Sequence, residues 1–278
     1  MSELVLVAVR GWAEGTRLAR ATVSLRPGAR AEVVHVLEGE DRSEARSEAR
    51  RAVDHAVAQL HEQGVEADGH VVARVGLSVA DRLTAEARER GASFVVMGSR
   101  GRDRLGSLTG PSVSHGMPAG ADAAVLAVPD RALVPREGFR RVLVALDADQ
   151  DVGLALPVLA ELPATPEVLL LHVARRVALR VPATGGTYVE LPETSGDLLE
   201  SARGRLRHEG FEVATRQVPE HGRVSQSIAN AARDWDADLV VLCSHRPGGL
   251  AGLITGSTAH GVLHHGDRPV LLAPIRGG

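Results

Sequence analysis

Short apolar runs alternate with longer stretches of mixed polarity along the whole chain. The first run, LVLVAV at residues 4–9, is continuous rather than alternating, as expected of a strand buried on both faces of a sheet. Residues 43–63 follow a different period, in which Val53 and Leu60 fall on one face of a helix. Strands that alternate with helices in this way predict a parallel sheet covered by helices on both faces.

The same pattern predicts ten strands, five in each half of the chain. Helical segments separate most of them, and those of the second half lie near residues 150–161, 194–209 and 224–234. The predicted strands are residues 4–9, 31–37, 69–75, 93–97 and 123–128 in the first half and residues 141–146, 167–173, 211–218, 238–242 and 269–273 in the second.

The second half repeats the order of the first. His35 and His172 each end the second strand of their half, and Ser112 and Ser257 each follow the loop after the fourth strand. A unit written twice predicts an α/β fold with two doubly wound, Rossmann-like domains, each with a five-stranded parallel sheet flanked by helices.

The expected domains are residues 1–130 and 140–278, joined by a linker at residues 131–139 that is rich in proline and arginine. Their fifth strands, residues 123–128 and 269–273, would each leave an apolar edge exposed if the domains stood apart. We therefore expect the two domains to pack against each other as an internal pseudo-dimer.

Composition restricts the class of function. A net charge of −3 and an aromatic content of 2% argue against binding to nucleic acid. All 32 basic residues are arginine, which excludes the phosphate-binding lysine of a P-loop and any lysine nucleophile. A single cysteine, Cys243, forms no internal disulfide, and no run approaches the ~20 apolar residues of a membrane span. We expect a cytoplasmic protein that does not bind membranes.

Loops rich in glycine and hydroxyl groups follow the fourth strand of each half. In the first half, Gly98, Ser99, Gly101 and Ser112 offer backbone that can approach an anion closely, next to the start of a helix. The corresponding residues of the second half are Arg246, Gly256, Ser257 and Thr258. Both loops are typical of a phosphate site, but the glycines also suit a plain turn and the two serines also suit helix N-caps.

These loops resemble the signature of the universal stress protein family, which reads glycine, two residues, glycine, nine residues and a final Gly-Ser or Gly-Thr pair. Gly98 and Gly101 match its start in the first half, where the final pair reads Pro111-Ser112. The resemblance covers nearly the whole chain and indicates a tandem member of the family.

The second half matches the end of the signature with its Gly256-Ser257 pair, while Cys243 and Arg246 replace the two earlier glycines. The resemblance also implies an aspartate after the first strand that contacts adenosine. Asp147 fills that position in the second half and Arg10 in the first. A carboxylate there also suits a cap of the following helix.

What the resemblance implies is an ATP-binding regulatory protein of the stress response, with Mg²⁺ accompanying the nucleotide and the backbone of Val173 beside the adenine. It also implies an unidentified protein partner, allows a homodimer, and indicates at most a slow ATPase, with no catalytic residue assigned. The alternative is a nucleotide-free protein-interaction module with degenerate loops.

The two halves are expected to be unequal in nucleotide binding. The second keeps Asp147 and the Gly256-Ser257 pair, whereas the first carries Arg10 and Pro111, and proline has no N–H to donate. We predict that ATP binds more tightly to the second half. His260 and His264 share a helix face, but no spacing completes a tetrahedral site, so no metal site is predicted.

Overall fold

A computed structural model gives the architecture of the protein. The residues that the structure describes are 3–38, 43–99, 123–148, 150–174, 195–220, 222–243 and 257–273.

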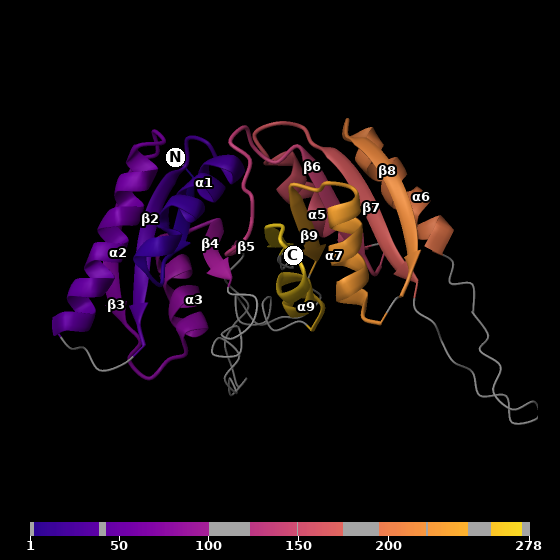
Figure 1. Cartoon of the computed structure of the whole chain (residues 1–278). Helices are drawn as coiled ribbons and strands as arrows, with labels where there is room; N and C mark the ends of the chain where they lie inside the picture. Colours follow the sequence, from indigo (N-terminus) through magenta and orange to yellow (C-terminus); the bar gives the residue numbers. More distant parts are fainter. Residues whose placement is uncertain are drawn as a thin grey trace, which may run out of the picture.

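Strands alternate with helices in both halves, as the sequence predicts (Figure 1). The first half contains β1 (Leu4–Ala8), the short 3-10 helix η1 (Trp12–Glu14), α1 (Gly15–Leu25), β2 (Arg30–Leu37), α2 (Ser43–His61), β3 (Ala67–Ala73), α3 (Val79–Arg90), β4 (Phe94–Ser99) and β5 (Ala124–Pro129). The second half contains β6 (Arg141–Leu146), α5 (Gln150–Ala160), β7 (Glu167–Ala174), α6 (Ser195–His208), β8 (Glu212–Pro219), α7 (Val224–Asp234), β9 (Leu239–Cys243), α9 (Ser257–His265) and β10 (Val270–Ala273).

All ten strands belong to one sheet, in the order β3-β2-β1-β4-β5-β10-β9-β6-β7-β8. Neighbours within each half are parallel, and only β5 and β10 are antiparallel to each other. The predicted fold class is therefore confirmed, with two Rossmann-like halves of five parallel strands each. Their sheets are not separate, because the pairing of β5 with β10 joins them into one mixed sheet.

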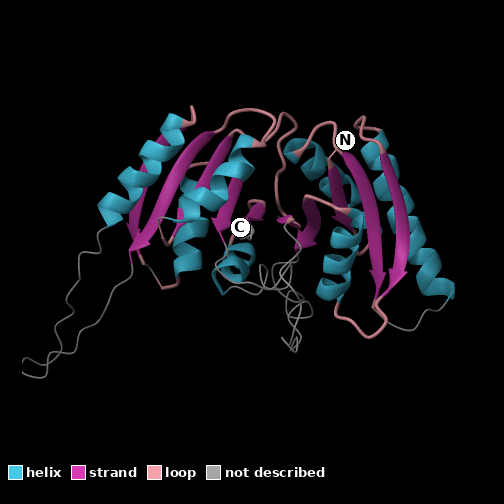
Figure 2. Cartoon of the chain, turned by 180° about the vertical axis from the view of Figure 1, so that it is seen from behind, coloured by secondary structure: helices cyan, strands magenta, loops and turns pink. Residues whose placement is uncertain are grey.

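Helices cover both faces of this sheet (Figure 2). Leu18 of α1 and Leu60 of α2 belong to the core on one face, which also takes in α5 and α6. Leu83 of α3, Ile228 of α7 and Val262 of α9 belong to the core on the other face. This double cover explains the continuous apolar runs, since every side chain of β4 and β5 is buried.

The outer strands of the two halves end on the same side of the molecule. The arrowheads of β2, β3, β7 and β8 all point toward the lower side of Figures 1 and 2. Adjacent strands of a sheet are generally rotated by about 20–25° relative to one another. Over the ten strands this rotation would add up to about half a turn, which offsets the reversal of direction between β5 and β10.

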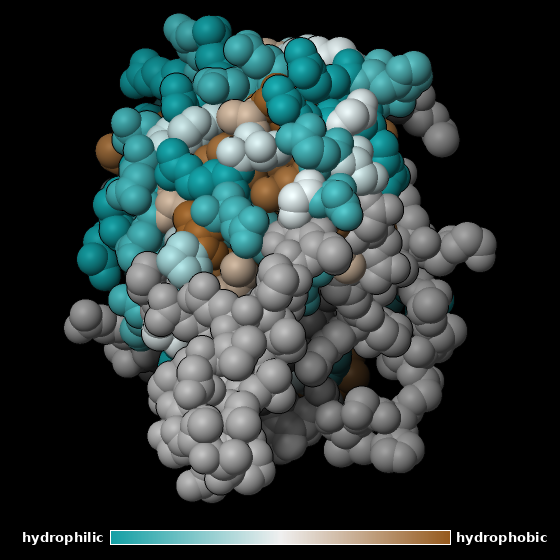
Figure 3. Space-filling model, turned by 90° about the vertical axis from the view of Figure 1, so that its right-hand side faces the viewer, coloured by the Kyte–Doolittle hydropathy of each residue, from teal (hydrophilic) through white to brown (hydrophobic). Residues whose placement is uncertain are grey.

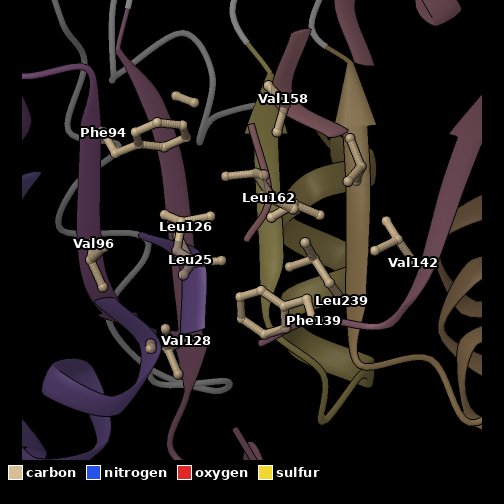
Figure 4. Packing of buried hydrophobic residues seen from close by; sticks show 14 of the residues in the cluster. Leu25, Phe94, Val96, Leu126, Val128, Phe139, Val142, Val158, Leu162 and Leu239 are labelled. Carbon is tan, nitrogen blue, oxygen red and sulfur yellow. The ribbon is translucent and has the colours of Figure 1, made fainter. Parts of the chain in front are cut away.

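The antiparallel pair of β5 and β10 forms the internal pseudo-dimer predicted from the sequence. Leu126 lies opposite Leu271, and neither side chain is exposed. The core on this face continues through both halves, and Figure 4 shows Leu25 and Leu126 packed in one layer with Leu162 and Phe139. The two halves therefore share one core and do not form two separate ones.

An arginine reinforces this joint. Arg26 follows α1, and its side chain is only 12% exposed. It forms ion pairs with Glu161 of the second half at 2.5 Å and with Glu3 at 3.0 Å, and its guanidinium lies 4.8 Å from the centre of the Phe94 ring.

Residues 130–140, which connect the halves, pack against the body of the protein. Ala132 and Val134 are buried, and Ser24 of α1 donates a hydrogen bond of 2.5 Å to the backbone oxygen of Pro135. This segment is therefore part of the shared core and not a free tether.

The open edges of the sheet are β3 and β8, and both carry polar side chains. Arg216 lies within β8, which ends at Pro219, and Asp68 and His70 lie on β3. Figure 3 shows that hydrophilic residues predominate on the described part of the second-half side, with small hydrophobic groups between them. Charged residues and proline are typical of edges that avoid pairing with other chains.

Among the described residues, no helix is both long enough and apolar enough to cross a membrane.

We predict that replacing one leucine of the joint destabilises both halves together. Leu126→Ala removes a fully buried side chain and should lower the free energy of unfolding by about 2–5 kcal/mol, in a single urea transition. Leu133→Ala is the matched control, because Leu133 is 82% exposed. Equal midpoints for the two variants, or a second transition in the wild type, would contradict a shared core.

Candidate functional site

The candidate site lies where the strand order reverses in each half. β1 stands between β2 and β4, and β6 stands between β7 and β9. In open parallel sheets, ligands bind beyond the carboxyl ends of the strands at such a position.

Three neighbouring strands of the second half bring residues singled out in the sequence to one edge. The register pairs Leu146 of β6 with His172 of β7, so Asp147 and Val173 follow side by side. Ala145 pairs with Leu242, which places the end of β9 on the other side of β6. Asp147 is exposed and Val173 is buried.

Asp151 shapes the turn that presents Asp147. Its side chain is 1% exposed, and Oδ2 accepts hydrogen bonds from the backbone N–H groups of Asp147 at 2.6 Å and of Ala148 at 2.9 Å. Asp151 also lies in the first turn of α5, where a negative charge is favourable. The acid that binds the backbone at the start of this helix is thus Asp151, and Asp147 is an exposed residue.

Cys243, the last residue of β9, packs beneath this turn. Its Sγ donates to the backbone oxygen of Asp151 at 3.2 Å. Burial raises the pKa of the Cys243 thiol far above its usual range, and the charge of Asp151 adds to the effect. The thiol is therefore protonated at neutral pH and serves as a small packing group.

The start of α9 lies at the same edge, because a helix that connects two parallel strands runs antiparallel to them. Ser257 is its first residue, and Thr258 in the first turn is partly exposed. The helix is held close to α7, since a Cβ at Gly261 would lie 2.5 Å from the Cβ of Ser225. Glycine at this position allows the two helices to touch.

Four residues expected at the two sites lie outside the described residues. They are Gly101, Ser112, Arg246 and Gly256.

The first half has a different arrangement at the corresponding edge. Glu14, which is 7% exposed, accepts a hydrogen bond from the backbone N–H of Arg10, and its Oε2 lies 3.4 Å from Arg10 Nη2. A Cβ at residue 98 would collide with Glu14 Oε2 and would lie 3.4 Å from Arg10 Nη2. Packing therefore explains the glycine at position 98 without any bound phosphate. Because Gly98 has no side chain, there is room for the Glu14 carboxylate.

Ser99 follows Gly98 at the end of β4, beside Pro129 of β5. It is 2% exposed, and its Oγ has no hydrogen-bond partner among the residues that the structure describes. Side chains alternate along a strand, so Ser99 and Gly98 face opposite sides of the sheet.

His35 lies near the end of β2 and His172 near the end of β7. His172 Nδ1 lies 3.0 Å from the backbone oxygen of Leu146, which connects β7 to β6. Burial lowers the pKa of His35, against the opposing effect of nearby carboxylates, of which Glu14 is the strongest. The His172 ring therefore supports the edge on which the second-half site lies.

The histidine rings of α9 contact one another, His260 stacked with His264 and His264 edge-on to His265. The ring centres of His260 and His264 are 6.4 Å apart, and those of His264 and His265 are 4.7 Å apart. Within the described ranges, no group of three or more histidine, cysteine or acidic side chains is placed to hold a metal ion.

Sequence reasoning missed Glu14 and Asp151. Glu14 lies four residues after Arg10, and Asp151 lies four residues after Asp147. The repeat therefore carries a signal, which is an acid at the same place in both copies. Nothing in the local pattern shows that either acid is buried.

The model of the universal stress protein family matches residues 1–129 and 138–274. The chain belongs to the universal stress protein family. A family member from Mycobacterium tuberculosis is 30% identical over 185 residues, which cover 66% of this chain and 62% of that protein. The match thus spans about three fifths of the length of that relative.

Solved structures of the family show the same architecture. The alignment with a universal stress protein from Archaeoglobus fulgidus covers 99% of this chain and 97% of that chain, with a TM-score of 0.70. The sequence identity is 19%, so the likeness concerns the fold. Another from the same organism, solved in complex with dAMP, is 25% identical, covers 35% of this chain and 81% of its own, and has a TM-score of 0.31. The dAMP is a ligand of that protein.

The contact between Glu14 and Gly98 predicts a specific coupling. Gly98→Ala should lower the free energy of unfolding by about 1–3 kcal/mol, because the added methyl group meets the Glu14 carboxylate. Glu14→Asp in the same chain shortens the acid and should recover part of this loss in a double-mutant cycle. Gly196→Ala in α6 is the control, since a Cβ there meets nothing within 4 Å. Additive effects of the two substitutions would contradict the contact.

The lowered pKa of His35 predicts a pH dependence of stability. The unfolded chain takes up a proton on this residue near pH ~6.5, above the folded pKa. The contribution of His35 to the free energy of unfolding is therefore complete above that pH and is lost as the pH falls toward the folded pKa. Urea titrations at pH 7.5 and 5.5 should show a smaller loss for His35→Gln than for the wild type. His208→Gln, at the end of α6, should match the wild type.

Proposed function

We propose that the second half binds an adenine nucleotide and that the chain acts as a nucleotide-dependent regulatory protein of the stress response. The observation that carries this proposal is the exposed carboxylate of Asp147 beside the backbone of Val173, at the edge where α9 also begins. Nucleotide binding is known in the family through the dAMP complex.

The chemistry of this edge suits a nucleoside phosphate. A carboxylate accepts hydrogen bonds from a ribose hydroxyl or an adenine amino group. The first N–H groups of a helix have no partner within it, so the start of α9, at Ser257 and Thr258, favours the negative charge of phosphates. Mg²⁺ usually accompanies such phosphates. With no lysine in the chain, Arg246 is the cation that we assign to the phosphate chain.

The first half supports a different role, and we propose it as a nucleotide-free interaction module. Arg10 stands at the position of Asp147 and is paired with Glu14. Gly98, Ser99, Gly101 and Ser112 would then belong to a degenerate loop. The proposed domains are residues 1–130 and 140–278, with residues 131–139 between them.

Calorimetric titration with ATP and Mg²⁺ tests the proposal. Asp147→Ala should weaken binding by about tenfold to a hundredfold, the loss expected for one hydrogen bond to a charged group. Asp234→Ala, an exposed acid at the end of α7, should bind like the wild type. Unchanged affinity in Asp147→Ala would contradict the assigned site. If the wild type shows no heat of ATP binding and carries no nucleotide after purification, the nucleotide-free interaction module is favoured for the whole chain.

A further inference from the structure

The repeat allows the two strand edges to be compared position by position. Arg10 in one half and Asp147 in the other occupy equivalent positions beyond the first strand. The buried acid four residues later is Glu14 or Asp151. The third position, at the end of the fourth strand, is Gly98 or Cys243.

These differences are coupled through space in the first half. Glu14 is one methylene longer than Asp151, and its carboxylate extends from the β1 turn onto the end of β4, against Gly98. Arg10 contacts the same carboxylate twice, through its backbone N–H and through Nη2. The charge and volume of Glu14 therefore lie between β1 and β4, at the reversal of strand order.

The shorter acid of the second half stays within its own turn. Asp151 Oδ2 accepts from the N–H groups of Asp147 and Ala148. The side chain of Cys243 occupies the position at the end of β9 that Gly98 leaves open in β4, and it bonds the Asp151 backbone. A long acid with glycine and a short acid with cysteine are thus two ways of filling the same space.

We propose that the Glu14 carboxylate, held by Arg10, is a built-in occupant of the first-half site, so that one chain binds one nucleotide, in its second half. This inference rests on the proposed function. The Glu14 carboxylate takes the place of a ligand beside β4, and Arg10 pairs with it without any ligand. The first half then serves as the structural partner of the second.

The test copies the second-half residues into the first. In calorimetry with ATP and Mg²⁺, the wild type should bind one nucleotide per chain, and the double variant Arg10→Asp/Glu14→Asp should bind two. Adding Asp147→Ala to the double variant should leave one site of unchanged affinity, because that site is in the first half. Urea unfolding of each variant confirms that it is folded.

Each outcome decides the proposal. Two sites in the wild type would overturn the built-in occupant and the nucleotide-free role of the first half, and would leave the nucleotide site of the second half intact. One site in a folded double variant would overturn the built-in occupant alone. If the wild type binds no nucleotide and the double variant binds one, the proposed function is refuted and the built-in occupant is supported. No binding by either protein would refute both.

A reciprocal variant covers the case in which the double variant does not fold. Asp151→Glu/Cys243→Gly creates the arrangement of the first half in the second and leaves Asp147 in place. The longer acid should then lie against residue 243 and lower the affinity for ATP at least tenfold. An affinity equal to that of the wild type would overturn the proposal.

Discussion

The antiparallel pairing of β5 with β10 is the interaction on which the rest of the structure depends. Each strand is fully buried, so neither could be an open edge of a separate domain. Pairing them buries Leu126 against the second half, extends one core through both repeats and leaves the polar strands β3 and β8 as the edges. The duplicated chain thereby joins its two homologous halves through a contact within one polypeptide.

Joining the two repeats in one chain also changes which structural features each repeat has to keep. Both halves keep the pairing surface, the covering helices and a histidine near the end of the second strand. Only the strand edge itself is free to differ, and there the halves diverge: Asp147 is exposed in one, whereas Arg10 is paired with a buried acid in the other. The nucleotide site that we propose lies in the half that keeps the exposed Asp147.

Arginine carries the cationic roles throughout, because the chain has no lysine. Arg26 shows why this matters for packing: a planar guanidinium pairs with Glu3 and Glu161 and also lies over Phe94, which a compact ammonium would do less well. Arg10 uses the same geometry at the first-half edge. Electrostatics in this protein are thus largely local and partly buried.

The sequence by itself determined the repeat, the ten strands, the family and the position of Asp147, because periodicity and motif spacing are local properties of the chain. It also indicated the pairing of β5 with β10, since two apolar edge strands need cover. Only the tertiary structure decided the role of Gly98. In the sequence, a glycine near the end of a strand is typical of a phosphate loop. In the structure, the Glu14 carboxylate reaches Gly98 only because β1 and β4 are neighbours in the sheet. The sequence shows that the first half has the longer acid, Glu14, and the second half the shorter one, Asp151, but only the tertiary structure shows what each acid contacts.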